Sequence, residues 1–156
     1  MAIAITLKEY LADRGVDYDV VTHAPTGSSS QTAQVSHIPG DRIAKAVILK
    51  DDDGYVMAVL PSTHHIDLGA VCHLMERSLA LATEEDVVRL FADCDMGAVP
   101  ALGSAYGMSV IMDDSLAAPP EIYFEGGDHA SLVHVSGMQF QDLMADSRRG
   151  QFSDHD

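Results

Sequence analysis

Lys45 is the residue whose type and setting most suggest chemistry. It lies in residues 42–50, a run rich in β-branched and aliphatic residues that is typical of a β-strand. Alternate side chains of a strand share a face, so Lys45 shares one with Ile43, Val47 and Leu49. An ammonium group among aliphatic side chains either extends to the margin of the sheet or faces a cavity. The chain has only three lysines, so the position of this one carries weight.

A glycine-punctuated segment, residues 97–103, is a second candidate for ligand contact. Gly97 and Gly103 bracket Pro100, and this combination gives a stiff loop whose backbone a ligand can approach closely. The spacing fits neither a P-loop nor a dinucleotide fingerprint. The segment is therefore either a ligand-binding loop or a plain connection between elements.

His129 follows a strand-like run and the pair Gly126 and Gly127. This arrangement places an imidazole either at the rim of a pocket or in an ordinary surface turn. The other histidines lack the spacing of a zinc site, so we expect no metal and no cofactor. Asp113 follows the strand-like run 108–112, where it either orients a ligand or caps a turn, and capping is the simpler interpretation.

The predicted elements that must position these residues are strands and helices without a regular βαβ rhythm. We expect helices over residues 6–14, 30–36, 68–75, 83–91 and 136–144. We expect strands over residues 17–23, 42–50, 55–60, 79–82, 108–112, 121–125 and 131–135. Thr6 and Glu9 have the spacing of a capping box for the first helix. The order favours a mixed α+β domain with a curved or barrel-like sheet.

The length predicts one domain, residues 1–145, followed by a polar tail over residues 146–156 that we expect to be frayed. No apolar run approaches the length needed to cross a bilayer, and residues 1–30 do not have the pattern of a signal peptide. We therefore expect a cytoplasmic protein that does not act at a membrane.

Charge restricts the possible partners. The chain has 9 Lys and Arg against 24 Asp and Glu, a formal net charge of -15. Such a surface repels nucleic-acid phosphates at long range. Any role on nucleic acid must therefore rest on a small local positive patch.

Six segments, taken together and in order, resemble the YbaK/EbsC family, also called the prolyl-tRNA-synthetase-associated editing domain, which includes the ProX-like aminoacyl-tRNA deacylases. The segments are residues 22–26, 42–49, 59–61, 97–103, 110–113 and 122–129. The resemblance covers roughly residues 16–145, and the ordered set is more specific than any one motif. It implies a mixed fold around a largely antiparallel, barrel-like sheet flanked by helices.

The same resemblance implies a stand-alone trans-editing aminoacyl-tRNA deacylase, a hydrolase that cleaves the ester of mischarged tRNA. Its partners would be the acceptor end of the tRNA and, in some relatives, an aminoacyl-tRNA synthetase. It implies catalytic roles for Lys45, Gly97, Gly103 and His129. It implies substrate binding by six further residues, His23, Thr26, Pro100, Asp113, Gly126 and Gly127.

The implied chemistry is compatible with these residue types. Backbone N–H groups of a glycine loop can receive the negative charge that develops on the carbonyl oxygen during ester hydrolysis. No residue stands out as a strong nucleophile, so attack by an oriented water is the more economical mechanism. The alternative is a non-catalytic binding module of the same fold that recognises a small aminoacyl-type ligand or a protein partner. The acidic charge favours that alternative, and so does Ala101, where relatives commonly carry proline.

Overall fold

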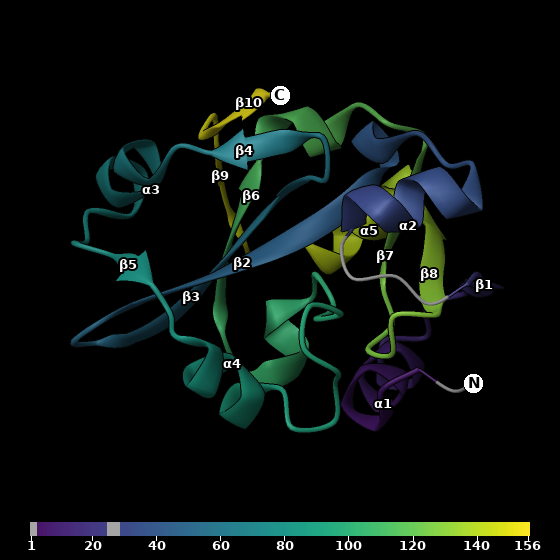
Figure 1. Ribbon diagram of the computed structural model, residues 1–156. Helices are drawn as coiled ribbons and strands as arrows, with labels where there is room; N and C mark the ends of the chain where they lie inside the picture. Colours follow the sequence, from purple (N-terminus) through teal and green to yellow (C-terminus); the bar gives the residue numbers. More distant parts are fainter. Residues whose placement is uncertain (1–2, 25–28) are drawn as a thin grey trace.

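The computed structural model describes residues 3–24 and 29–156. A large mixed sheet runs through its centre and helices cover both faces (Figure 1). The helices are α1 (Ile5–Asp13), α2 (Ser29–Ser36), α3 (Leu68–Met75), α4 (Glu84–Leu90) and α5 (Gly137–Leu143). Short 3-10 helices are η1 (Gly40–Arg42), η2 (Gly103–Tyr106) and η3 (Asp114–Ala117). Within the described residues, none of these helices is long and apolar enough to cross a membrane.

The strands form two sheets. They are β1 (Asp19–Thr22), β2 (Ile43–Asp51), β3 (Gly54–Pro61), β4 (His64–Ile66), β5 (Ala80–Leu81), β6 (Ser109–Asp113), β7 (Glu121–Glu125), β8 (Ser131–Ser136), β9 (Arg148–Gly150) and β10 (Ser153–His155). The larger sheet has the order β1-β8-β7-β2-β3-β6-β9, and β5 also pairs with β2. The smaller sheet joins β10 to β4. The predicted mixed fold, with a large and mostly antiparallel sheet flanked by helices, is confirmed.

The predicted hairpin over residues 42–60 forms the middle of the large sheet. Strands β2 and β3 pair antiparallel from Ala44 opposite Pro61 to Asp51 opposite Gly54. The Asp51 carboxylate closes the turn by accepting hydrogen bonds from the main-chain N–H groups of Asp53, at 2.9 Å, and Gly54, at 3.1 Å. The φ of Gly54 is 137°, a value that side chains rarely adopt. The Asp-Gly turn signal therefore has a direct structural cause.

The two faces of this hairpin pack into different hydrophobic clusters. One cluster includes Ala44 and Ile48 of β2, and α1 and α5 pack into it. The other includes Leu49 of β2, and Val71 of α3 packs into it. Because side chains alternate along a strand, Lys45 points to the same face as Leu49. Strand β3 is buried on both faces, since successive residues from Val56 to Leu60 are fully covered.

Helix starts were predicted with mixed success. Asp67 caps α3 by accepting from the Ala70 N–H at 3.0 Å, as expected. Thr83 and Ser136 cap α4 and α5 in capping boxes. The expected capping box of α1 is wrong, because that helix starts with Ala4 at the N-cap and no side-chain cap. The Thr6 N–H instead donates to Asp93 at 2.8 Å, so a carboxylate distant in sequence accepts a hydrogen bond at the N-terminus of this helix.

The expected fraying of residues 146–156 is also wrong. Strand β9 pairs in parallel with β6, and β10 pairs antiparallel with β4. Phe152, between these two strands, is 1% exposed and belongs to the cluster under α3. One large aromatic side chain thus anchors a segment whose composition is otherwise polar. Whether a domain boundary falls at residue 145 stays a prediction.

Candidate active site

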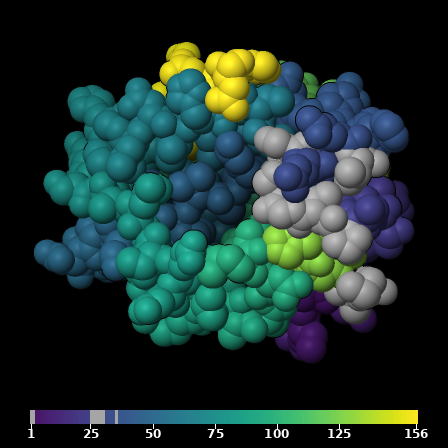
Figure 2. Space-filling model, in the orientation of Figure 1, coloured from purple at the N-terminus to yellow at the C-terminus, as the bar shows by residue number. Residues whose placement is uncertain are grey.

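A gap in the strand pairing of β2 defines the candidate site. Strand β7 pairs with β2 at Ile43 and Ala44, and β5 pairs with the same strand at Leu49 and Lys50. Between these pairings, in the part of the chain that the structure describes, residues 45–47 have no ladder partner on that edge. On the face shown in Figure 2, the blue atoms of this region are set back between teal atoms of the α3 region and light-green atoms of the turn after β7. The gap in the pairing therefore leaves this edge of β2 open next to Lys45.

Lys45 is half-buried in a central strand and is not at a sheet margin. Its Nζ donates to the main-chain oxygen of His64, and Ser62 O lies 3.5 Å away. Burial lowers the pKa of Lys45 below its ordinary value, although the Asp156 carboxylate opposes the shift. The β3–β4 connection thus holds an ammonium group beside the gap.

Glu125 lies on β7, the strand next to β2, at the position that corresponds to Lys45. Ala44 is opposite Phe124 in the parallel ladder, and both side chains belong to the cluster under α5. The next residue on each strand, Lys45 on β2 and Glu125 on β7, therefore points to the other face. Helix α2 lies in front of β7 and β8 on that face (Figure 1), and Thr32 of α2 donates to Glu125 Oε1 at 3.1 Å. Two opposite charges thus face the region under α2.

His129 and the start of the glycine loop are brought together. The Nε2 atom of His129 lies against the main-chain oxygen of Met96, the residue before Gly97. The main-chain N–H of Asp95 donates to Gly127 O at 2.7 Å, so a second bond ties the loop to the turn after β7. The φ of His129 is 60°, in the left-handed region that few side chains adopt. The turn therefore presents this imidazole to the loop.

His23 lies at the same end of the sheet as His129. Its main-chain N–H donates to Ala130 O at 2.9 Å, next to His129. Its ring Nδ1 lies 2.7 Å from Ala24 O. Burial raises the pKa of Glu125 above its ordinary value, while the hydrogen bond from Thr32 and the proximity of His23 and His129 oppose the shift. His23, Glu125 and His129 thus form one cluster.

The sequence did not single out Glu125 or Thr32 as functional. Glu125 was noted only as part of a motif. A carboxylate at the end of an apolar strand, just before a glycine pair, is itself a sequence signal of a functional residue. Thr32 lies in a polar helix whose sequence does not show which side chain faces the sheet. Only the packing of α2 on β7 brings these two residues together.

The two glycines of the predicted loop have different settings. Gly97 is exposed and its φ is 83°, so it is suited to present backbone to a ligand. Gly103 is buried, and an added Cβ would lie 2.8 Å from Val110 Cγ2 and 3.2 Å from Met57 Cβ. Close packing explains that glycine without a ligand. Pro100 is buried between them.

Gly126 and Gly127 pack against the start of the chain. An added Cβ at Gly126 would lie 2.9 Å from Ile3 Cγ2, and one at Gly127 would lie 3.0 Å from Ala4 Cβ. Gly126 O also accepts from the Ala4 N–H at 2.8 Å. The pair is thus required for packing next to the site, and its predicted contact with substrate stays a prediction.

One predicted substrate-binding residue, Asp113, is not part of this cluster. Asp113 is buried, and its carboxylate accepts from the main-chain N–H groups of Ser115 and Phe152. It caps η3, which is the simpler of its two predicted interpretations. Thr26 lies outside the described residues. A ligand role for either residue stays a prediction.

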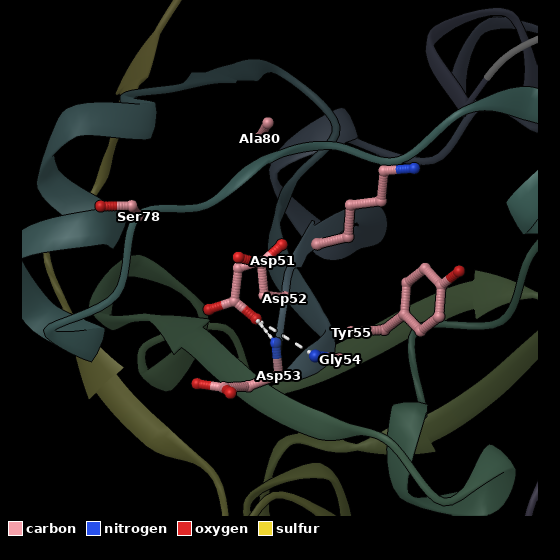
Figure 3. A pocket seen from close by; sticks show the side chains of 8 residues that line it. Asp51, Asp52, Asp53, Gly54, Tyr55, Ser78 and Ala80 are labelled. Atoms are coloured by element: carbon pink, nitrogen blue, oxygen red, sulfur yellow. Dashed lines mark hydrogen bonds between the residues drawn. The ribbon is translucent and has the colours of Figure 1, made fainter.

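An open hollow of about 760 Å³ lies at the other end of β2, around the turn from Asp51 to Gly54 (Figure 3). Two of the charged side chains that line it, Lys50 and Asp51, are already paired. Arg77 donates to both oxygens of Asp51, at 2.6 and 2.7 Å, and Lys50 lies 2.8 Å from Asp86. None of the predicted site residues lines it, so we place the candidate site at the gap beside Lys45.

The described residues contain no group of three or more His, Cys, Asp or Glu side chains that could hold a metal ion. The candidate site instead has a cation on β2, a carboxylate on β7, two imidazoles and the exposed Gly97. These groups can bind a polar substrate at two oppositely charged ends, and the main chain at Gly97 is open to approach by a ligand.

Residues 23–143 match the model of a family described as the aminoacyl-tRNA editing domain. The match spans most of the chain, so this protein belongs to the aminoacyl-tRNA editing domain family. The resemblance seen in the sequence is confirmed. A comparison with curated protein sequences found no match.

Solved structures share the fold at low sequence identity. A candidate trans-editing enzyme for prolyl-tRNA synthetase has a TM-score of 0.84 and 22% identity, with 96% of this chain and 95% of that chain covered. A protein described only as hypothetical has a TM-score of 0.82 and 21% identity, with 96% and 99% covered. A candidate signal transduction protein from Marinobacter aquaeolei VT8 has a TM-score of 0.78 and 21% identity, with 96% and 30% covered. The same fold thus occurs both alone and within a longer chain.

Proposed function

We propose that this chain is a stand-alone trans-editing aminoacyl-tRNA deacylase that hydrolyses the ester of mischarged tRNA. The observation that carries the proposal is the half-buried Lys45 beside an unpaired stretch of β2, in a chain of the editing-domain family. The acceptor end of a tRNA is single-stranded, so a narrow gap can admit it. A synthetase partner is compatible with the fold of the trans-editing candidate.

In the proposed reaction an oriented water attacks the ester carbonyl. Backbone N–H groups near Gly97 receive the oxyanion, and Lys45 binds the terminal phosphate or ribose. His129 donates to Met96 O through Nε2, so it positions the loop that starts at Gly97. Discrimination rests on the size of the gap, which rejects larger side chains better than smaller ones.

The non-catalytic alternative is supported by a specific feature, the net charge of -15, which weakens affinity for tRNA. Deacylation of a panel of mischarged tRNAs at several salt concentrations separates the two. Hydrolysis of at least one substrate above the spontaneous rate supports the deacylase. Binding of a non-hydrolysable aminoacyl-adenosine analogue without hydrolysis of any substrate supports the binding module.

A further inference from the structure

The cluster of His23, Glu125 and His129 contains buried polar atoms that lack partners. In residues 3–24 and 29–156, His23 Nε2, Glu125 Oε2 and His129 Nδ1 are buried and have no hydrogen-bond partner. Glu125 itself is only 2% exposed. A buried polar atom without a hydrogen-bond partner is unfavourable, and a bound ligand can provide the missing partner.

With both rings neutral and Glu125 ionised, hydrogen-bond chemistry makes all three atoms acceptors. A carbonyl oxygen can only accept, so His129 Nε2 must donate to Met96 O. In the neutral ring this leaves Nδ1 with a lone pair. By the same argument His23 donates through Nδ1 to Ala24 O, which leaves its Nε2 as an acceptor. Glu125 Oε1 receives the hydrogen bond of Thr32, and ionised Oε2 is free to accept.

A set of three buried acceptors, one of them anionic, matches an ammonium group. An ammonium carries three N–H donors and no acceptor, so its donors match these three acceptors in number. A water molecule can donate only two hydrogen bonds. The residues do not have the arrangement of a metal site within the described chain. Every aminoacyl ester carries an α-ammonium group, whatever its side chain.

We infer that Glu125, His23 and His129 bind the α-ammonium group of the aminoacyl ester. The inference rests on the proposed deacylase function and adds how the substrate is oriented. The ammonium lies toward β7 and α2, and the phosphate-bearing end lies toward Lys45 on β2. The ester is then held between the two charges, next to the loop at Gly97. Recognition of this kind requires a free α-amino group on the substrate but does not depend on the side chain of its amino acid.

The test compares two acyl groups on the same tRNA. A mischarged tRNA that the protein hydrolyses is prepared with its amino acid and with the α-hydroxy acid of the same shape, in which a neutral hydroxyl replaces the ammonium. Each rate is divided by the spontaneous rate of that ester, since the two differ in intrinsic reactivity. The wild-type protein should prefer the aminoacyl ester about tenfold or more in kcat/KM. Glu125→Gln keeps the acceptor for Thr32 and should reduce that preference to about one.

Glu121→Gln is the matched control. Glu121 lies on the same strand and face but is partly exposed and contacts Arg42 and His134. This variant should keep the wild-type preference. Equal normalised rates for the two esters with the wild-type protein would overturn the inference and leave the deacylase intact. This comparison needs no variant, so it holds even where Glu125→Gln folds poorly. Absence of hydrolysis from every mischarged tRNA would overturn the proposed function and the inference with it.

Discussion

The main-chain N–H of Phe152 donates to Oδ1 of Asp113 over 2.9 Å, and both residues are buried. The other carboxylate oxygen accepts from the main-chain N–H and the hydroxyl of Ser115. One side chain at the end of β6 therefore holds both η3 and the connection between β9 and β10. This bond fixes the end of the chain near Lys45, because β10 pairs with β4 and β4 provides the carbonyl of His64.

Asp113→Ala should destabilise the protein by about 1–3 kcal/mol, because it leaves buried N–H groups without an acceptor. Burial would raise the pKa of Asp113, but hydrogen bonds from Ser115 and Phe152 hold it below its ordinary value. The stability that the carboxylate adds is thus present above its ordinary pKa and lost as the pH falls below it. Urea unfolding from pH 7 to pH 3 checks both effects. Asp114→Ala, an exposed neighbour, is the control, and equal midpoints for both variants at pH 7 would contradict the assignment.

Glu125→Gln should affect stability in the direction opposite to Asp113→Ala, since it should stabilise the protein as the pH rises. Burial raises the pKa of Glu125, so the folded protein carries an unfavourable charge once the pH exceeds that pKa. The variant should therefore melt at a higher temperature than the wild type near pH 8, and the difference should disappear as the pH falls to the ordinary pKa of a glutamate. Thermal melts over this range check it. A variant less stable than the wild type at pH 8 would show that the charge is satisfied in the folded protein.

Lys45→Ala should lower kcat/KM by about 10- to 100-fold, because it removes a charged hydrogen-bond donor to the terminal phosphate or ribose, and such bonds contribute about 1.5–3 kcal/mol. The fold should remain, because the side chain is only half-buried. Lys50→Ala is the control on the same strand, since Lys50 pairs with Asp86 at the other end. Deacylation and circular dichroism are measured together. Wild-type hydrolysis by the Lys45 variant would remove this residue from the site.

Gly97→Ala should reduce turnover more than stability. The positive φ of Gly97 means that a Cβ costs about 1–2 kcal/mol in backbone strain. Gly107 has a φ of 70° and open space around it, so Gly107→Ala introduces the same kind of strain away from the site. Both variants should lose similar melting temperature, and only Gly97→Ala should lose deacylation. Parallel losses of turnover in the two variants would mean that the loop has only a structural role.

Binding of tRNA should depend weakly on salt. Few cations are free to meet phosphates, because Lys50 pairs with Asp86 and Arg42 lies 3.6 Å from Glu121. Each neutralised phosphate of a single strand contributes a slope of about -0.7 in log affinity against log salt, and repulsion by the acidic surface opposes it. Deacylation at subsaturating substrate, with full tRNA and an acceptor minihelix side by side, checks the slope. A steep loss with salt, together with a strong preference for full tRNA, would show a wide basic footprint.

The sequence predicted those parts of the fold that depend on local pattern. The hairpin of β2 and β3 follows from alternating apolar residues and an Asp-Gly turn, and α3 from its Asp67 cap. Strands β9 and β10 were missed because Arg148 and Asp154 are exposed and polar, and one buried residue, Phe152, holds the segment. Lys45 could be singled out from strand alternation alone. The cluster of His23, Glu125 and His129 could not, since it is formed by three chain segments that meet only in the folded sheet.

The central position of β2 restricts how this region of the chain can vary in length. A one-residue insertion or deletion before Lys45 would move Ala44 and Ile48 out of one cluster and turn the lysine into it, where its charge would be buried without a partner. The exposed turn at Asp52 and Asp53 has no such restriction. Length differences among natural homologues should therefore occur at the turn and spare residues 43–51. The same turn is the place where a foreign peptide could be inserted without disturbing the strand.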